Sequence, residues 1–171
     1  MGFFDFLKKK EDVQQVPVWP AILGAECKGT VVPMENIPDE VFSQGILGQC
    51  IGIDPAEGKV FAPVDGEITQ APDSGHALGL MSIGGVEVLI HVGVDTVEMR
   101  GDGFAVLVEK DAYVTAGTPL IVFDREKIRA AGHDDIVMVS VTNASGEALP
   151  AVASGAEVRA GEPLFTLDGR A

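Results

Sequence analysis

The chain has 171 residues, of which 46% are hydrophobic, so it is long enough for one domain with a sizeable core. Its 26 acidic and 12 basic residues give a net charge of −14, which argues against nucleic acid as a partner and favours basic proteins. Two cysteines, Cys27 and Cys50, are too few for a disulfide framework, and we expect both to be buried as small hydrophobic residues.

The first ten residues, MGFFDFLKKK, place Phe3, Phe4 and Leu7 on one face of a short helix that is followed by three lysines. One interpretation is a flexible tail, because a helix this short is unstable in water. The other is an amphipathic helix that touches a membrane weakly, since basic amphipathic segments bind anionic lipid.

Residues 11–20 contain two prolines and no hydrophobic period, which is typical of a linker. We therefore expect a flexible N-terminal segment over residues 1–19 and one folded domain over residues 20–171. The sequence shows no signal peptide and no apolar run of membrane-spanning length. A cytoplasmic location is expected, peripheral at the inner face of the plasma membrane if the N-terminal segment binds lipid.

From residue 21 onward, short apolar stretches alternate with Gly, Pro and Asp turns. Only residues 39–44 and 125–131 favour a helix. The predicted strands are residues 29–33, 50–53, 59–62, 66–70, 77–83, 86–94, 105–108, 119–124 and 136–142. This pattern predicts an all-β fold, a β-sandwich or barrel of short, mostly antiparallel strands with little helix.

The C-terminal part of the domain contains an internal repeat. Residues 108–124 match residues 152–168 at an offset of 44, with 8 of 17 positions identical. A weaker match joins residues 28–31 to residues 65–68. Each main copy predicts a strand, a tight turn and a second strand. Biotinyl and lipoyl carrier domains share this pattern, so it indicates an internally duplicated architecture rather than a function.

One stretch, GGVEVLIHVGVDTV from Gly84, places a histidine in the middle of a predicted strand. Strand side chains alternate, so Val88, Ile90 and Val92 point to one side, and His91 points to the other. An isolated histidine of this kind is often only a half-exposed surface residue. A rigid strand that presents one imidazole is also a good platform for chemistry.

A second histidine, His76, begins the strand before the Gly84-Gly85 turn. Pairing about Gly84 places position 76 opposite position 92, next to His91. The hairpin therefore permits contact between the two imidazoles.

The stretch from Gly85 to Val97 resembles the phosphorylation-site signature of the glucose-type IIA proteins of the bacterial phosphoenolpyruvate:sugar phosphotransferase system, and it fills every fixed position. The resemblance extends from about Val31 to the last strand. It implies a duplicated β-sandwich and a phosphotransferase with a phosphohistidine intermediate. Such a protein accepts a phosphoryl group from the carrier HPr and passes it to a cysteine of a IIB domain of a sugar permease, for sugar uptake and phosphorylation.

The resemblance also implies roles for the site residues. His91 would carry the phosphoryl group on Nε2, with Nδ1–H held by the backbone carbonyl of Gly93. His76 would donate a hydrogen bond to the phosphoryl oxygens, and Ser74 would orient His76. A neutral imidazole suits the first role because its pKa is about 6.5 and phosphoryl transfer needs an in-line nucleophile.

Around this site the family presents an apolar patch with acidic residues that meet a basic carrier. The matching apolar residues are Phe42, Ile46, Leu47, Leu89 and Val97, and the matching acids are Asp39 and Asp95. The alternatives are ordinary core residues and solvated charges. Gly75, Pro72 and Leu89 differ from the residues usual in the family. His133 has no motif partner and is expected at the surface.

Two other functions compete with phosphotransfer as interpretations of this sequence. A zinc hydrolase of related architecture needs a third protein ligand, which His76 and His91 lack, although a partner's carboxylate would complete a zinc bridge between proteins. No metal or cofactor is required for phosphotransfer. A biotinyl carrier needs a lysine in an exposed turn flanked by methionines, and neither repeat supplies one. Regulatory docking of metabolic enzymes or permeases on the same surface is compatible with phosphotransfer, and the sequence does not specify the sugar.

Overall fold

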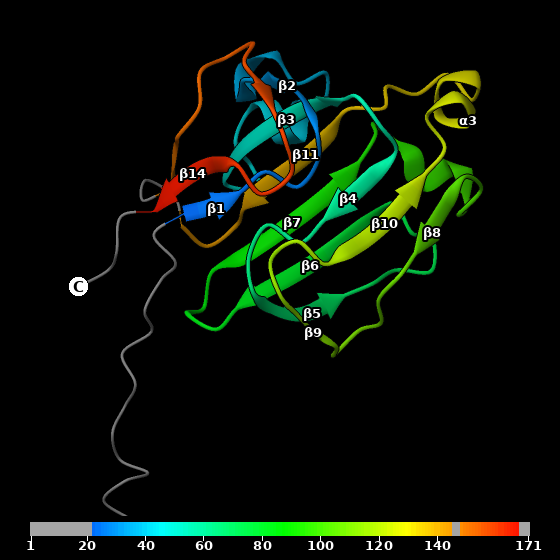
Figure 1. The fold of residues 1–171 in the computed structure, drawn as a ribbon. Helices are drawn as coiled ribbons and strands as arrows, with labels where there is room; N and C mark the ends of the chain where they lie inside the picture. The colour runs from blue at the N-terminus through cyan, green and yellow to red at the C-terminus, as the bar shows by residue number, and fades with distance from the viewer. Residues whose placement is uncertain (1–21, 145–147, 168–171) are drawn as a thin grey trace, which may run out of the picture.

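The computed structural model describes residues 22–144 and 148–167, which form three antiparallel β-sheets and very little helix (Figure 1). The predicted all-β fold is confirmed. The proposed N-terminal helix over residues 1–10 and the linker lie outside the described residues. The strands are β1 (Ile22–Gly24), β2 (Gly29–Val32), β3 (Gln49–Pro55), β4 (Lys59–Phe61), β5 (Gly66–Gln70), β6 (Ala77–Ser82), β7 (Glu87–Val92), β8 (Phe104–Val106), β9 (Tyr113–Val114), β10 (Pro119–Phe123), β11 (Val137–Val141), β12 (Ala148–Pro150), β13 (Glu157–Val158) and β14 (Pro163–Leu167).

Eight strands form the large sheet, in the order β13-β2-β3-β11-β7-β6-β5-β9. The small sheets have the orders β1-β14-β12 and β4-β10-β8. The main hydrophobic core includes residues from all three sheets. The two central strands, β7 and β11, are about fifty residues apart in the chain. They pair in a regular antiparallel register, in which His91 is opposite Met138.

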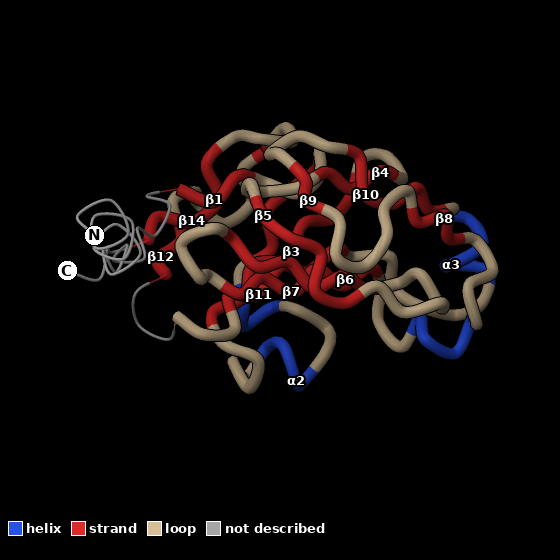
Figure 2. Tube along the Cα trace, turned by 90° about the horizontal axis from the view of Figure 1, so that it is seen from below, coloured by secondary structure: helices blue, strands red, loops and turns tan. Residues whose placement is uncertain are grey.

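Helices lie at the periphery (Figure 2). The short helix α2 (Glu40–Ser43) lies over one face near β7 and β11, and α3 (Arg125–Ala130) lies at one end. Both predicted helices are present, and each is N-capped by an aspartate side chain, Asp39 or Asp124. Two 3-10 turns, η1 (Met34–Asn36) and η2 (Thr96–Met99), were not predicted.

Strand β7 shows why the alternating pattern was informative. Val88, Ile90 and Val92 are buried in the main core, whereas Leu89 and His91 on the other side are half-buried. The strand is shorter than the predicted 86–94, because Gly93 has a φ of +77° and turns the chain away from the sheet.

The duplication is visible in the burial of the two copies. The strand pair β9 and β10 has the same alternation of exposed and buried positions as the pair β13 and β14. Gly117 and Gly161 occupy the intervening turns with φ values of +87° and +88°. The sequence did not predict β1 or β12, which are only three residues long.

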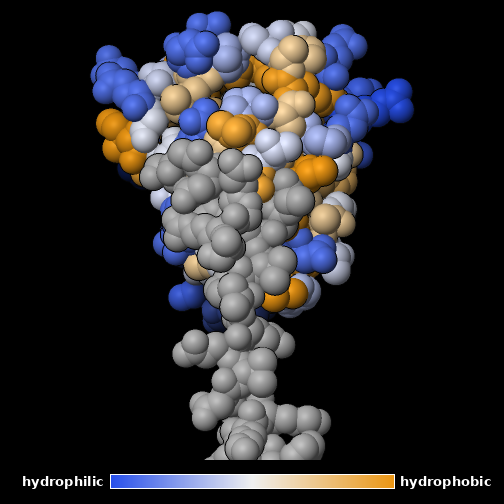
Figure 3. All heavy atoms as spheres, turned by 90° about the vertical axis from the view of Figure 1, so that its left-hand side faces the viewer, coloured by the Kyte–Doolittle hydropathy of each residue, from blue (hydrophilic) through white to orange (hydrophobic). Residues whose placement is uncertain are grey.

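Figure 3 shows the molecule from the left-hand side of Figure 1, where hydrophobic residues form small groups among hydrophilic ones.

Cys27 and Cys50 are buried, as predicted. Within the described ranges, no helix is long and apolar enough to cross a membrane.

Candidate functional site

The antiparallel hairpin of β6 and β7 brings the two predicted histidines together. Ala77 pairs with His91, and the amide of Val92 donates to the carbonyl of His76 at 2.7 Å. The two imidazole centroids are 5.0 Å apart and the rings are nearly perpendicular, at 79°. The predicted pairing about Gly84 is confirmed, and it brings residue 76 next to His91.

The tautomer of His91 follows from the partner of one ring nitrogen. Nδ1 lies 2.8 Å from the carbonyl oxygen of Gly93, and a carbonyl oxygen can only accept. Nδ1 therefore carries the proton in the neutral ring, and Nε2 carries a lone pair. A β-carbon at position 93 would lie 2.9 Å from the carbonyl oxygen of Asp134 and would also clash with the Thr96 side chain, so only glycine places this carbonyl here.

His76 is more enclosed than His91, with 8% of its surface exposed. Its Nδ1 lies 2.7 Å from the hydroxyl oxygen of Ser74. Between the two, Gly75 adopts a φ of +66°, which a larger residue would adopt only with strain. Gly75 thus allows a tight turn that brings Ser74 onto the ring.

Both imidazoles favour the neutral form. Burial lowers the pKa of His76 below 6.5, and the adjacent charge of His91 lowers it further. Burial also lowers the pKa of His91, against opposing effects from the Gly93 hydrogen bond and from Asp39 and Asp95. At neutral pH both rings are therefore mainly uncharged, and Nε2 of His91 has a free lone pair.

The apolar residues expected around the site divide into two groups. Phe42 is buried, with its ring centroid 5.3 Å from that of His91, so it packs beneath the histidine. Leu47 and Leu89 are half-buried against the same small cluster. Ile46 and Val97 are exposed, at 66% and 55%.

The two acids also differ. Asp39 is half-buried, and its carboxylate accepts from the amide of Val41 at 2.9 Å, so it caps α2 as well as contributing charge. Asp95 is exposed and has a φ of 58°, at the turn that follows Gly93. Both carboxylates influence the pKa of His91, which places negative charge at the rim of the site.

Two residues near the site were missed or misplaced by the sequence reasoning. Thr96 is fully buried, and its hydroxyl donates to the carbonyl of Val92, holding the turn after β7. Its only signal was its place in the signature. His133, expected at the surface, has a side chain only 14% exposed and lies 3.7 Å from Glu98. The long-range contact with η2 shields it.

Across the part of the chain that the structure describes, no group of three or more His, Cys, Asp or Glu side chains could hold a metal. His76 and His91 supply two nitrogen atoms and no third ligand.

The sequence profile of one family, described as the phosphoenolpyruvate-dependent sugar phosphotransferase system, EIIA 1, matches residues 21–147. A glucose-specific EIIA component from Halalkalibacterium halodurans is 36% identical over 156 residues, covering 91% of this chain and 90% of the relative. A glucose-specific EIIA component from Bacillus cereus is 44% identical over 119 residues, covering 70% and 72%.

Some relatives are much longer. The β-glucoside-specific EIIBCA component of Bacillus subtilis is 38% identical over 146 residues. The match covers 85% of this chain but only 24% of that relative. Among solved structures, glucose permease IIA from Mycoplasma capricolum matches with a TM-score of 0.77 and 30% identity, covering 86% of this chain and 95% of that one.

Proposed function

This chain belongs to the EIIA 1 family of the phosphoenolpyruvate-dependent sugar phosphotransferase system, and we propose that it carries the phosphoryl group on Nε2 of His91. It is a phosphocarrier in sugar uptake and a phosphotransferase with a phosphohistidine intermediate. The observation that supports His91 is the 2.8 Å contact from Nδ1 to the Gly93 carbonyl, which leaves the Nε2 lone pair for attack.

In the accepting step, Nε2 of His91 attacks the phosphorus atom held by a phosphohistidine of HPr. The new N–P bond forms as the old one breaks, and the imidazole of HPr leaves. Nδ1–H keeps its proton, and the Gly93 carbonyl stabilises the positive charge that develops on the ring. In the next step a IIB cysteine thiolate attacks phosphorus, and neutral His91 is the leaving group.

His76 is proposed to donate Nε2–H to the phosphoryl oxygens, which carry charge throughout transfer. This needs an Nδ1 that accepts, and the Ser74 hydroxyl, 2.7 Å away, is able to donate to it. The Ser74 hydroxyl is thus compatible with this tautomer of His76, whereas the Gly93 carbonyl, which can only accept, selects the tautomer of His91.

The partner surface is proposed to combine exposed Ile46 and Val97 with the acids Asp39 and Asp95, and to bind HPr and the IIB domain in turn. Leu47 and Leu89 contribute its half-buried base, and Phe42 supports it from below. Regulatory enzymes or permeases would dock on the same surface, where a partner's carboxylate could join His76 and His91 around zinc.

The sugar is proposed to be of the glucose type, as the names of the two separate EIIA relatives indicate. For the N-terminal segment, residues 1–19, we propose a weak peripheral membrane contact through its aromatic and lysine residues, separate from the catalytic domain over residues 20–171. Binding of the whole chain to anionic vesicles, compared with a chain that begins at Pro17, tests this contact.

The central experiment incubates the chain with phosphoenolpyruvate, enzyme I and HPr, and maps acid-labile phosphate at neutral pH. We expect one phosphate, on Nε2 of His91, that disappears when IIB domain and sugar are added. Omission of HPr is the control and should leave the chain unlabelled. Phosphate on His76 or His133, or no phosphate, would overturn the assignment.

A further inference from the structure

The geometry points to Asp135 as a positioning residue for His91, held by Arg125 and Arg129 and acting through Gly93. The inference rests on the proposed role of His91 as phosphoryl acceptor. Among the described residues, no hydrogen bond or ion pair joins these three charged side chains to the imidazole, so Asp135 would act through the backbone that it fixes.

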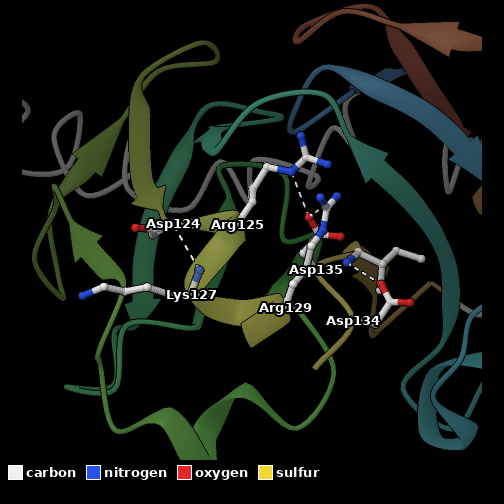
Figure 4. A network of polar contacts seen from close by, with 7 residues as sticks. Asp124, Arg125, Lys127, Arg129, Asp134 and Asp135 are labelled. Carbon is white, nitrogen blue, oxygen red and sulfur yellow. Dashed lines mark hydrogen bonds and ion pairs between the residues drawn. The ribbon is translucent and has the colours of Figure 1, made fainter. Parts of the chain in front are cut away.

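Asp135 is a buried acid between two arginines from one helix (Figure 4). Only 5% of the residue is exposed. One carboxylate oxygen accepts from Nε of Arg125 at 2.8 Å and lies 3.1 Å from Nη2 of Arg129. Charge-assisted hydrogen bonds of this length are strong and directional, and more so where water is excluded.

The helix that supplies the arginines is itself anchored. Asp124 caps α3 by accepting from the amide of Lys127 at 3.1 Å, and Ile128 is fully buried in the main core. Arg125 and Arg129 are four residues apart, so both project from the same face of α3 toward Asp135. The carboxylate is therefore attached to a rigid part of the molecule.

The residues on either side of Asp135 hold the turn that follows β7. The carbonyl of Ile136 accepts from the amide of Gly93 at 2.7 Å, and that of Asp134 accepts from the amide of Val94 at 3.0 Å. The Asp134 carboxylate accepts from the Ile136 amide at 2.8 Å, which makes residues 134–136 a compact turn. This turn defines where Gly93 lies.

The position of Gly93 in turn affects the protonation of Nε2 of His91. Gly93 accepts the Nδ1 proton of His91, and this bond determines that Nε2 is unprotonated. If residues 134–136 lose their anchor, the carbonyl of Gly93 shifts, and the proton redistributes toward Nε2. The fraction of His91 that is ready to attack then falls.

The same helix provides a matched control. Lys127 forms an ion pair with Asp102 at 2.9 Å, and both side chains are largely exposed, at 53% and 71%. Lys127→Gln removes a charge and an ion pair from α3 without touching Asp135.

The experiment measures the tautomer of His91 by 15N NMR of the unphosphorylated chain, and the rate of phosphoryl acceptance from HPr. In Asp135→Ala we expect a larger Nε2–H population and a rate about tenfold lower, typical of losing a group that orients a reactive side chain. Lys127→Gln should match wild type in both. An unchanged tautomer in Asp135→Ala would overturn the inference.

Milder variants cover the case in which Asp135→Ala does not fold. Arg125→Gln removes the 2.8 Å partner and should shift the tautomer in the same direction, whereas Arg125→Lys should restore part of the effect. A wild-type tautomer in Arg125→Gln would equally overturn it. Because the NMR measurement needs no phosphate, failure of wild type to be phosphorylated on His91 tests the proposed function separately.

Discussion

The large sheet consists of two similar halves that have acquired different side chains. We call β5, β6, β7 and β9 the histidine half, and β2, β3, β11 and β13 the glutamate half, because Glu26 lies in the loop between β1 and β2. Several backbone hydrogen bonds beside these strands correspond between the two halves. The Ala62 carbonyl accepts from Gly117 at 2.9 Å, and the Ala25 carbonyl accepts from Gly161 at 2.9 Å.

The difference lies in what each half buries at equivalent places. By this correspondence Pro63 in one half matches Glu26 in the other. Glu26 is fully buried, and neither carboxylate oxygen has a hydrogen-bond partner among the described residues. Burial raises the pKa of Glu26 to about 8. The same backbone pattern therefore tolerates very different side chains, so the proposed chemistry depends on particular residues of the histidine half.

The substitution with the largest expected effect removes the proposed phosphoryl acceptor, His91, from the histidine half. His91→Ala should accept no phosphoryl group, because no other imidazole has an Nε2 prepared by a backbone carbonyl in the described chain. Acid-labile phosphate after incubation with HPr is the measurement. His133→Ala is the control and should be labelled like wild type. If His91→Ala still becomes phosphorylated and still supports sugar phosphorylation, then His91 is not the phosphoryl acceptor.

The next effect is on the stability of the glutamate half. The folded pKa of Glu26, about 8, lies above its ordinary value of 4.5, so the folded chain binds the extra proton between these pH values. The free energy of unfolding should therefore fall as pH rises through this window, by roughly 5 kcal/mol in total from this group. Glu26→Gln should remove that slope and be the more stable protein at pH 8.5.

Urea unfolding at pH 5 and pH 8.5 measures the slope for each protein, and the difference between wild type and variant isolates Glu26. If the free energy of unfolding changes by the same amount between pH 5 and pH 8.5 in wild type and in Glu26→Gln, then Glu26 is not protonated in the folded protein.

A smaller effect separates the two histidines. His76→Gln keeps a donor near the phosphoryl oxygens but loses the imidazole that Ser74 orients. Loss of one preorganised donor lowers rates by roughly 10² to 10³, and we expect this mainly in transfer to the IIB domain, where neutral His91 must leave. A two-stage assay measures it: the variant is phosphorylated, isolated and then mixed with IIB domain and sugar. Equal onward rates for wild type and variant would contradict the role of His76.

The smallest effect concerns the acidic rim of the histidine half. Asp39→Asn with Asp95→Asn removes two charges, while asparagine at position 39 can still cap α2. Association with HPr should slow several-fold at low salt and converge with wild type at about 0.5 M salt, because surface charges are then screened. Stopped-flow association rates measure this. A salt-independent difference would point to altered packing rather than to steering.

Much of the site was predictable because it is local. The alternation of Val88, Ile90 and Val92 determines which side His91 faces, and the turn at Gly84 sets the register that places residue 76 beside it. Three features were not predictable: the position of Phe42 beneath His91, the shielding of His133 and the support of Gly93 by residues 134–136. Each depends on segments more than thirty residues apart in the chain.

The sequence by itself determined the strand faces, the hairpin, the duplication and the family signature, since these follow from side-chain alternation and short turns. Only the tertiary structure decided that Asp135 is buried between Arg125 and Arg129, and that the Glu26 carboxylate is buried without a hydrogen-bond partner among the described residues. The physical reason is that burial depends on what distant strands and helices place around a side chain. The identity of a charged residue in the sequence does not show whether its side chain will be exposed to water or buried in the core.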